Sequence, residues 1–267
     1  LEASLGQPPL FIRVNTLKIS TQELIEKLAQ EGIEAKVHPT LNNCLHLLHA
    51  GAVEKGVCFQ RGWFHVQDAS SQICVQALGA RPGERILDVC AAPGGKSFTI
   101  AQEMENTGEL LSSDLYEHRA ALIREGSKRL GIKILQAQAR DASGYDPSLG
   151  LADRVLCDVP CSGFGIIRRK PEIKYKALDE VKNLPQIQYK ILETSANYVK
   201  AGGILLYSTC TLSHHENEKV ASRFLREHPE FSPSPFDGED AGFPGQKTLF
   251  PDETHDGFFL QRFIKMR

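Results

Sequence analysis

From residue 67 onward the sequence alternates short apolar runs with longer stretches of helical periodicity, and this alternation restricts the possible folds more than any other feature. Strands that alternate with helices form a mostly parallel sheet covered by helices on both faces. We therefore predict an α/β, doubly wound, Rossmann-like domain. Its strands are expected at residues 85–89, 109–113, 133–136, 154–158, 203–208 and 257–264.

The residues before this domain follow a different pattern, which predicts a small α+β subdomain. A short strand is expected at residues 10–15, followed by a helix that Ser20 or Thr21 caps and Gly32 ends. We place the domain boundary after residue 66, which gives an N-terminal subdomain and a larger domain. Further strands of the subdomain are expected at residues 33–37, 44–48 and 63–66. The subdomain comprises residues 1–66 and the larger domain residues 67–267.

Three patterns predict where elements begin and end in the last part of the chain. The glycine pair at residues 202–203 is expected to stop a helix that includes Val199. Ser213 and Glu216 form a capping-box pattern, which predicts that the next helix begins there. Residues 233–251 are rich in Pro, Gly and Asp, so we expect a loop before the last strand.

Composition excludes several classes of protein. With 41% hydrophobic and 24% charged residues among 267, the chain can build a full core, which argues against disorder. The seven cysteines have no regular spacing, which favours reduced thiols and a cytoplasmic location, and no pattern typical of zinc ligands or another metal site is found. No apolar run approaches ~18 residues, so no membrane span is expected. The sequence begins at Leu1 instead of methionine, which is compatible with a longer protein.

The net charge of -2 gives no overall basic character, so any contact with nucleic acid requires a local patch. The segment that follows the fourth strand of the larger domain is the best candidate, because it gathers basic residues around an aromatic residue, Tyr175, that could stack on a base. The alternative is that these charges form an ordinary solvated surface. The candidate phosphate-binding residues are Arg168, Arg169, Lys170 and Lys174.

Acidic residues stand at or just after the carboxyl ends of four successive strands, namely Asp88, Asp114, Asp141 and Asp158. In an open α/β sheet these ends form the ligand crevice, so the carboxylates can converge. Asp114 is placed to accept hydrogen bonds from ribose hydroxyls, and Asp141 from an adenine amino group. Taken singly, each aspartate could instead end a strand or cap a helix.

The turn after the first strand of the larger domain has the composition of a cofactor loop. Gly94 and Gly95 would let the backbone approach a ligand closely. The turn lacks the Gly-x-Gly-x-x-Gly of dinucleotide sites, and Cys90 stands where a triphosphate loop needs its first glycine. A proline in the turn and the carboxylates around it favour S-adenosylmethionine (SAM), which has no phosphate and is cationic at sulfur. The residues of this loop are Cys90, Ala91, Ala92, Pro93, Gly94, Gly95 and Lys96.

Two cysteines follow strand ends, Cys161 in the sequence DVPCSG and Cys210 in the sequence STC. A thiolate that adds to carbon 6 of a pyrimidine makes carbon 5 able to attack a methyl sulfonium, which divides one hard step into two easier ones. The thiol pKa must be lowered, and a helix beginning just after Thr211 would contribute through its dipole. Asp158 is placed to hydrogen-bond the cytosine ring nitrogen, for which it must keep its proton, so burial is expected to raise its pKa. Cys161 is placed to assist the final elimination. The other five cysteines are expected to be buried hydrophobic residues.

Several of these segments together resemble the Sun family (RsmB/Fmu-like) of RNA 5-methylcytosine methyltransferases, and the resemblance covers nearly the whole chain. The segments that carry it are RVNTLK at 13–18, QDASSQ at 67–72, CAAPGGK at 90–96, DVPCSG at 158–163, IRR at 167–169, STC at 208–210 and DGFF at 256–259.

The resemblance implies a Rossmann-like SAM-dependent methyltransferase core, with a mostly parallel seven-stranded sheet whose last strand is antiparallel, and an RNA-recognition-like N-terminal subdomain. It also implies that Cys210 is the nucleophile and that Cys161 helps to release the methylated product. The implied substrate is RNA, with small-subunit ribosomal RNA preferred. The implied SAM contacts are the Cys90 to Lys96 loop, Asp114, Arg119, Asp141 and Asp158.

Two alternative functions remain open at this level. A DNA cytosine-5 methyltransferase would use Cys161 as the nucleophile, and an RNA-binding assembly factor would keep the fold without turnover. For the RNA enzyme, the target cytosine must be unpaired or flipped out, because stacking in a helix hides carbons 5 and 6.

Overall fold

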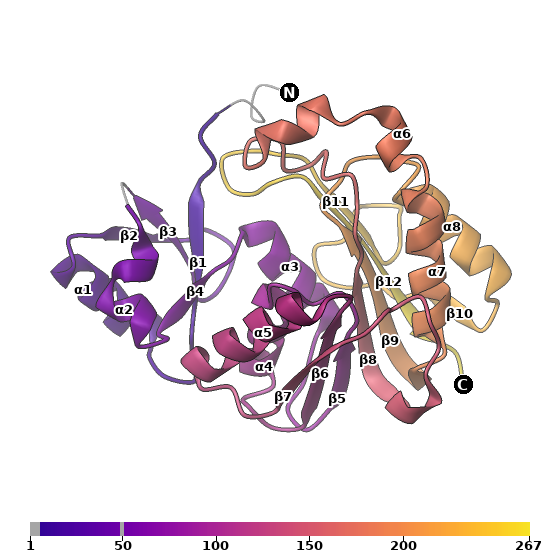
Figure 1. The fold of residues 1–267 in the computed structure, drawn as a ribbon, viewed down its shortest axis with the longest axis horizontal. Helices are drawn as coiled ribbons and strands as arrows, with labels where there is room; N and C mark the ends of the chain where they lie inside the picture. The colour runs from indigo at the N-terminus through magenta and orange to yellow at the C-terminus, as the bar shows by residue number, and fades with distance from the viewer. Residues whose placement is uncertain (1–5, 49–50) are drawn as a thin grey trace.

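The computed structural model describes residues 6–48 and 51–267, which form two sheets lying side by side (Figure 1). The smaller sheet is antiparallel, with the strand order β2-β3-β1-β4, and helices α1 and α2 lie beside it. Its elements are β1 (Leu10–Val14), α1 (Thr21–Gln30), β2 (Glu34–Val37), β3 (Cys44–Leu48), the 3-10 turn η2 (Val53–Lys55), α2 (Val57–Gln60) and β4 (Phe64–Val66).

The central strand of the small sheet, β1, is covered on both faces. Ile12 and Val14 pack with Leu28 of α1 on one face, and Phe11 packs with Leu41 on the other. A strand buried on both faces is apolar almost throughout, which is why the run LFIRV was recognisable in the sequence.

The larger sheet has the order β10-β12-β9-β8-β5-β6-β7, with β11 paired to β12. Strands β5 to β9 are parallel, and the last strand, β12, runs antiparallel to β9, as predicted. The strands are β5 (Arg85–Asp88), β6 (Glu109–Asp114), β7 (Leu135–Ala139), β8 (Ala152–Asp158), β9 (Val199–Thr209), β10 (Phe231–Pro233), β11 (Gln246–Leu249) and β12 (Phe258–Lys265). The helices and 3-10 turns are α3 (Ala69–Leu78), α4 (Gly95–Glu103), α5 (Glu117–Leu130), η3 (Pro147–Leu149), η4 (Pro171–Tyr175), α6 (Leu178–Val181), α7 (Leu184–Ala196) and α8 (Glu218–Glu227).

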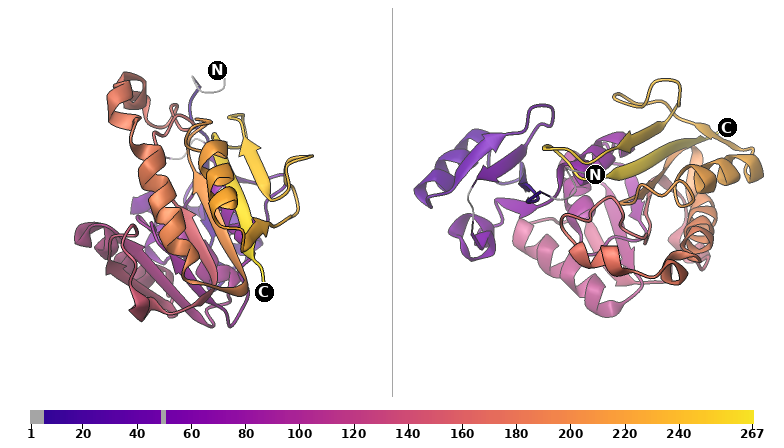
Figure 2. Two further views of the ribbon diagram at one scale, coloured as in Figure 1. Left: turned by 90° about the vertical axis from the view of Figure 1, so that its right-hand side faces the viewer. Right: turned by 90° about the horizontal axis from the view of Figure 1, so that it is seen from above.

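Helices cover both faces of this sheet, with α3, α4 and α5 on one side and α7 and α8 on the other (Figures 1 and 2). Neighbouring residues of one strand therefore enter different cores. Ile86 and Leu206 pack on the side of α3 and α4, whereas Leu87 and Leu205 pack on the side of α7 and α8. This burial on both faces accounts for the continuous apolar runs of the predicted strands.

The strand order reverses at β5, which lies between β6 and β8. A ligand crevice forms at such a switch point, outside the carboxyl ends of the strands. Asp88 ends β5 and Asp158 ends β8, so both stand at this position. Within the described residues, no helix has the length and apolar character needed to cross a membrane.

Two predicted helix limits are wrong. Helix α7 ends at Ala196, and Val199 belongs to β9 instead, because it pairs with β8 and is buried there. Helix α8 begins at Glu218 and not near Ser213, because the side chain of Glu216 is bonded to other parts of the chain and does not cap a helix.

The predicted loop at residues 233–251 contains a strand. Gln246–Leu249 forms β11, in which Leu249 is buried and pairs with Phe258 at the start of β12. The Pro and Gly residues before β11 form turns, so composition located the irregular part of this segment and missed the strand.

Candidate active site

The two thiols predicted from strand ends lie next to each other. Strands β8 and β9 are neighbours in parallel register, with Asp158 opposite Ser208. The chain continues past each strand end to a cysteine, and Cys161 Sγ lies 3.1 Å from Cys210 Sγ. All seven cysteines are free thiols. The structure thus brings together two residues that are far apart in the sequence.

The surroundings of the two thiols differ. The pKa of Cys210 is lowered, chiefly by its hydrogen bond with the Cys161 thiol. Burial and the Asp158 carboxylate oppose this shift, whereas the charges of Lys96 and Lys170 add to it. The pKa of Cys161 is raised by the same hydrogen bond and by burial. The proton therefore stays on Cys161, and Cys210 is the thiol that ionises more readily.

The predicted contribution of a helix dipole to Cys210 is wrong. Helix α8 begins only at Glu218, and residues that follow Thr211 form a turn. Because the dipole effect falls off within the first turn of a helix, α8 is too far along the chain to act on Cys210.

Asp158 forms an ion pair with Lys96 beside the thiols. Lys96 Nζ lies 2.7 Å from Asp158 Oδ2 and also donates to Ser71 Oγ at 3.2 Å, while Ser208 Oγ donates to Asp158 Oδ1 at 2.8 Å. Burial of the ammonium disfavours its charge, but the Asp158 carboxylate outweighs this and raises the pKa of Lys96. The ion pair of Lys96 and Asp158 therefore lies close enough for both charges to act on Cys210.

The predicted cofactor loop lines a cavity of about 170 Å³ at the ends of β5 and β8. Gly94 needs to be glycine, because it has a φ of 112° and a Cβ there would lie 2.4 Å from the ring of Phe98. Sequence reasoning assigned no role to four residues before α4 that share this wall, although QDASSQ was among the family-like segments. The lining residues are Val66, Gln67, Asp68, Ser71, Asp88, Cys90, Ala91, Ala92, Pro93, Gly95, Lys96 and Asp158.

Two of the lining residues carry buried polar atoms without a hydrogen-bond partner, Asp88 Oδ1 and Gln67 Nε2. Burial raises the pKa of Asp88 to about 7, against a hydrogen bond from Ser97 Oγ at 2.7 Å. Unpaired acceptors and donors in a cavity wall are available to a bound ligand.

Asp114 lies at the end of β6, close to the loop but not in the lining of this cavity. Its Oδ2 accepts a hydrogen bond from Ala92 N at 3.1 Å, and Arg119 Nη1 approaches its Oδ1 at 3.4 Å. Oδ1 is buried and accepts no hydrogen bond. Arg119 also donates to the Ala92 carbonyl at 3.0 Å, so Asp114 and Arg119 together support the loop.

Asp141 is exposed and shapes its own turn. Ser143 donates to Asp141 Oδ1 through its backbone N at 2.9 Å and its hydroxyl at 2.7 Å, and these bonds lower the pKa of Asp141. This is the turn-forming role that an aspartate after a strand often has. Its other oxygen remains open to a ligand.

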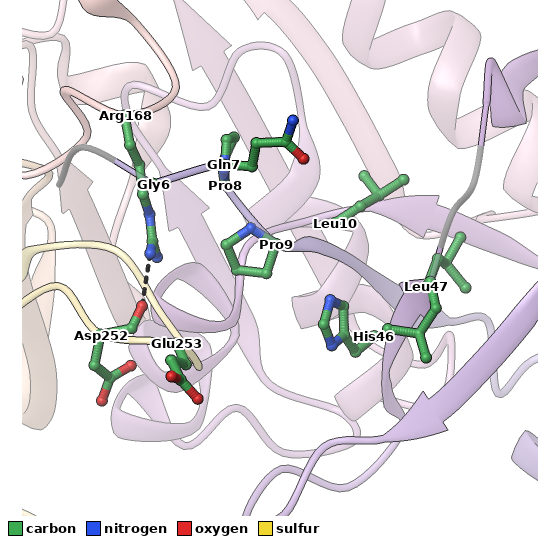
Figure 3. Close-up of a pocket in the computed structure, with 11 residues that line it drawn as sticks. Gly6, Gln7, Pro8, Pro9, Leu10, His46, Leu47, Arg168, Asp252 and Glu253 are labelled. Carbon is green, nitrogen blue, oxygen red and sulfur yellow. Dashed lines mark hydrogen bonds between the residues drawn. The ribbon is translucent and has the colours of Figure 1, made fainter. Parts of the chain in front are cut away.

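The structure corrects the role expected for Arg168 and Arg169. The Arg168 side chain is only 4% exposed and pairs with Asp256, and Arg169 pairs with Asp256 and, at 2.6 Å, with Asp68. Figure 3 shows Arg168 in the wall of a cavity of about 600 Å³, where its guanidinium donates to the Asp252 carbonyl at 2.6 Å. Both arginines therefore hold segments of the protein together through ion pairs, and the buried Arg168 is not part of an open phosphate-binding patch.

The other two predicted basic residues, Lys170 and Lys174, are exposed. Tyr175 is 86% exposed beside them. This part of the predicted patch can contact a ligand, and Lys170 is also among the charges that lower the pKa of Cys210. Among the residues that the structure describes, no group of three or more His, Cys, Asp or Glu side chains is arranged to hold a metal ion.

Two family models match the sequence. One, described as 16S rRNA methyltransferase RsmB/F, matches residues 75–264, and the other, described as an RsmF/B-like methyltransferase ferredoxin-like domain, matches residues 1–54. Among curated proteins, the chain is 43% identical over 229 residues to "Probable ribosomal RNA small subunit methyltransferase B" of Bacillus subtilis, which covers 85% of this chain and 51% of that protein. It is 39% identical over 270 residues to ribosomal RNA small subunit methyltransferase B of Yersinia pseudotuberculosis, which covers 99% of this chain and 62% of that protein. The chain thus spans about half to three fifths of the length of these relatives.

Solved structures share the fold over almost the whole chain. A methyltransferase homolog protein from Pyrococcus horikoshii is 30% identical, with a TM-score of 0.87 and coverage of 99% of this chain and 89% of that chain. NSun6 from the same organism, solved with SFG, is 22% identical, with a TM-score of 0.89 and coverage of 99% and 93%, a likeness that concerns the fold alone.

Proposed function

This chain belongs to the 16S rRNA methyltransferase RsmB/F family, and from this premise we propose that it transfers a methyl group from SAM to carbon 5 of a cytosine in RNA, with small-subunit ribosomal RNA as the substrate. The observation that carries the proposal is the pair of thiols 3.1 Å apart at the ends of neighbouring parallel strands. The ion pair of Lys96 and Asp158 and the cavity lined by the cofactor loop adjoin them.

In the proposed reaction the Cys210 thiolate bonds to carbon 6 of the cytosine, and the electron pair of the ring double bond moves to carbon 5. Carbon 5 then bonds to the methyl group, and the electrons of the broken sulfur–carbon bond remain on the departing sulfur. A general base then takes the carbon 5 proton, the electron pair of that bond restores the ring double bond, and the electrons of the carbon 6–sulfur bond return to Cys210 as its thiolate. Covalent catalysis of this kind replaces one high barrier with two lower ones.

The different pKa shifts of the two thiols support separate roles for them. Cys210 ionises more readily, so we assign it the attack. Cys161 retains its proton and donates a hydrogen bond to Cys210, so it can stabilise the Cys210 thiolate when that sulfur leaves carbon 6. The cytosine ring nitrogen accepts a hydrogen bond, so Asp158 is proposed to bond it in its protonated form, exchanging its ion pair with Lys96 for a proton when the base is bound.

The residues around the loop fit SAM, which when bound supplies a methyl group on a positively charged sulfur. Asp114 Oδ1, which accepts no hydrogen bond within the protein, suits a ribose hydroxyl, and Asp88 and Asp158 place carboxyl groups near a cationic ligand. Gly94 and Gly95 keep side chains out of the loop at the start of α4.

The proposal predicts opposite results for the two cysteines in a trapping experiment. With labelled RNA and SAM, Cys161→Ala should accumulate a covalent protein–RNA complex, because the adduct forms but is released slowly. Cys210→Ala should form none, since it lacks the attacking sulfur. Denaturing gels would separate the complex, and Cys58→Ala, in helix α2 beside the small sheet, is the matched control.

Other outcomes of the same experiment would favour the alternatives. Trapping in Cys210→Ala and none in Cys161→Ala would indicate the chemistry of a DNA cytosine methyltransferase. No adduct and no methyl transfer with any variant or the unmodified protein would indicate an assembly factor without turnover. Bisulfite sequencing of RNA from cells with and without the gene would then locate the modified cytosine, and a mark outside small-subunit ribosomal RNA would contradict the proposed substrate.

A further inference from the structure

Two consecutive buried residues, Glu216 and Asn217, lie in the turn between β9 and α8. Glu216 is 3% exposed and Asn217 is 1% exposed. Carboxylate and amide side chains are rarely buried to this extent unless their hydrogen bonds are made. The partners of both side chains flank the two thiols.

Glu216 bonds Ser162, which follows Cys161, directly, and it is connected through Gln188 to Pro160, which precedes Cys161. Its Oε2 accepts a hydrogen bond from Ser162 N at 2.9 Å, and its Oε1 accepts one from Ser162 Oγ at 2.6 Å. Gln188 Nε2 donates to Glu216 Oε2 and to the Pro160 carbonyl, each at 2.9 Å. These donors are neutral, and burying a carboxylate among neutral groups is costly unless every bond is made. The carboxylate therefore fixes the local path of the chain.

Asn217 holds the residues on both sides of Cys210. Its Oδ1 accepts a hydrogen bond from Thr209 Oγ1 at 2.6 Å, and its Nδ2 donates to the Thr211 carbonyl at 2.9 Å. Asn217 is the N-cap residue of α8, where an asparagine usually accepts a hydrogen bond from the first turn. Here its side chain caps nothing, so it stabilises the Cys210 turn in place of the helix.

A direct bond joins the two turns. Ser162 Oγ and Thr211 Oγ1 are 2.7 Å apart. A carboxylate only accepts hydrogen bonds, so the Ser162 hydroxyl donates to Glu216 and the Thr211 hydroxyl donates to Ser162. One continuous set of hydrogen bonds thus connects the segments that carry the two sulfurs.

We propose that Glu216 and Asn217 form a clamp that holds the Cys161 and Cys210 sulfurs at hydrogen-bonding distance. They are positioning residues, since they contact the neighbours of the thiols and not the reacting atoms. The role of the clamp in catalysis rests on the proposed function: it would keep Cys161 in place to donate a hydrogen bond whenever Cys210 is a thiolate. The geometry itself can be tested without RNA or SAM.

The test is the pH dependence of Cys210 alkylation by iodoacetamide, followed by mass spectrometry of the modified peptide. Glu216→Gln turns an NH₂ group toward the donors of Ser162 or Gln188 and should separate the turns. The alkylation midpoint of Cys210 should rise by about one pH unit, because the thiolate loses its hydrogen bond, which makes the reaction roughly tenfold slower at neutral pH. Cys161→Ala removes the donor itself, so the alkylation midpoint of Cys210 in this variant should also rise and serves as the reference for the direction of the shift. In turnover, kcat should fall while KM for SAM stays unchanged.

Glu218→Gln is the matched control, since Glu218 lies two positions along and pairs with His214 on the surface. The alkylation midpoint of Cys210 in Glu218→Gln should equal that of the unmodified protein. Ser162→Ala removes only the hydroxyl donor, and it decides the question if circular dichroism shows that Glu216→Gln does not fold. Unchanged alkylation profiles in both Glu216→Gln and Ser162→Ala would overturn the clamp. Failure of RNA trapping at Cys210 would instead contradict the proposed function and leave the alkylation result standing.

Discussion

At the scale of single residues, position in the fold decides which of two identical side chains is reactive. Cys161 and Cys210 share one hydrogen bond, and its direction lowers the pKa of one thiol and raises that of the other. Lys96 adds a positive charge near Cys210 while remaining paired to Asp158. A thiolate therefore forms at one defined sulfur, which a covalent mechanism requires.

Asp114 allows a test of the cofactor site at the same scale. Asp114→Ala should weaken SAM binding by roughly 10- to 100-fold, because a hydrogen bond to a charged group contributes about 1.5–3 kcal/mol. RNA binding should remain unchanged, since Asp114 lies at the cofactor loop and bonds Ala92 N. Isothermal titration calorimetry with each ligand would measure both. Asp141→Ala is the control with a smaller expected effect, because Asp141 is exposed and bonded to its own turn. Equal SAM affinity in Asp114→Ala and the unmodified protein would remove Asp114 from the site.

At the scale of elements, the sequence predicted strands better than helix ends. Strands such as β8 are buried on both faces, so their apolar runs are visible without knowledge of the fold. Helix limits depend on contacts made elsewhere. Glu216 has the spacing of a capping box, but its carboxylate accepts a hydrogen bond from Ser162, which is far away in the sequence. Val199 has helical spacing, but pairing with β8 places it in a strand.

The same limit applies to the predicted site. The strand-end cysteines and the cofactor loop could be found because each is recognised from residues that are adjacent in the sequence. Arg168 and Arg169 were assigned to RNA because their charges are local as well, whereas their partner, Asp256, is distant in the sequence. Nothing in a basic tripeptide indicates that a carboxylate from the segment before β12 neutralises it.

Asp256 should therefore matter for stability as the shared partner of two arginines. Asp256→Ala leaves the buried Arg168 without its carboxylate, and breaking a buried ion pair in this way should lower the free energy of unfolding by about 3–5 kcal/mol. Urea denaturation followed by circular dichroism would measure the loss. Glu253→Ala removes an exposed carboxylate from the same segment and should change stability little. Similar midpoints for the two variants would contradict the structural role assigned to Asp256.

At the scale of the whole molecule, the two sheets are joined by polar contacts that also build the cavity. Gln67 and Asp68 follow β4 of the small sheet and line the cavity of the large one. Thr99 Oγ1 in α4 donates to Gln67 Oε1 at 2.6 Å. At the other end of the interface, the turn at Gly62 approaches α5 so closely that a Cβ there would lie 2.1 Å from the Arg129 carbonyl. Docking of the small sheet therefore completes one wall of the proposed cofactor site.

Asn15 is the residue through which this docking can be tested. Its Nδ2 donates to the Gly62 carbonyl at 2.7 Å and to the Leu130 carbonyl at the end of α5 at 2.8 Å, and the side chain is fully buried. Asn15→Ala leaves two buried carbonyls without this donor, so it should lower the free energy of unfolding by about 2–4 kcal/mol. Hydrogen exchange should also become faster in β1 and β4 than in β8 and β9, because the small sheet loses its anchor before the large core opens. Asn42→Ala, an exposed change in the turn before β3, should alter neither measurement. Uniform exchange across both sheets in Asn15→Ala would show that the docking does not depend on Asn15.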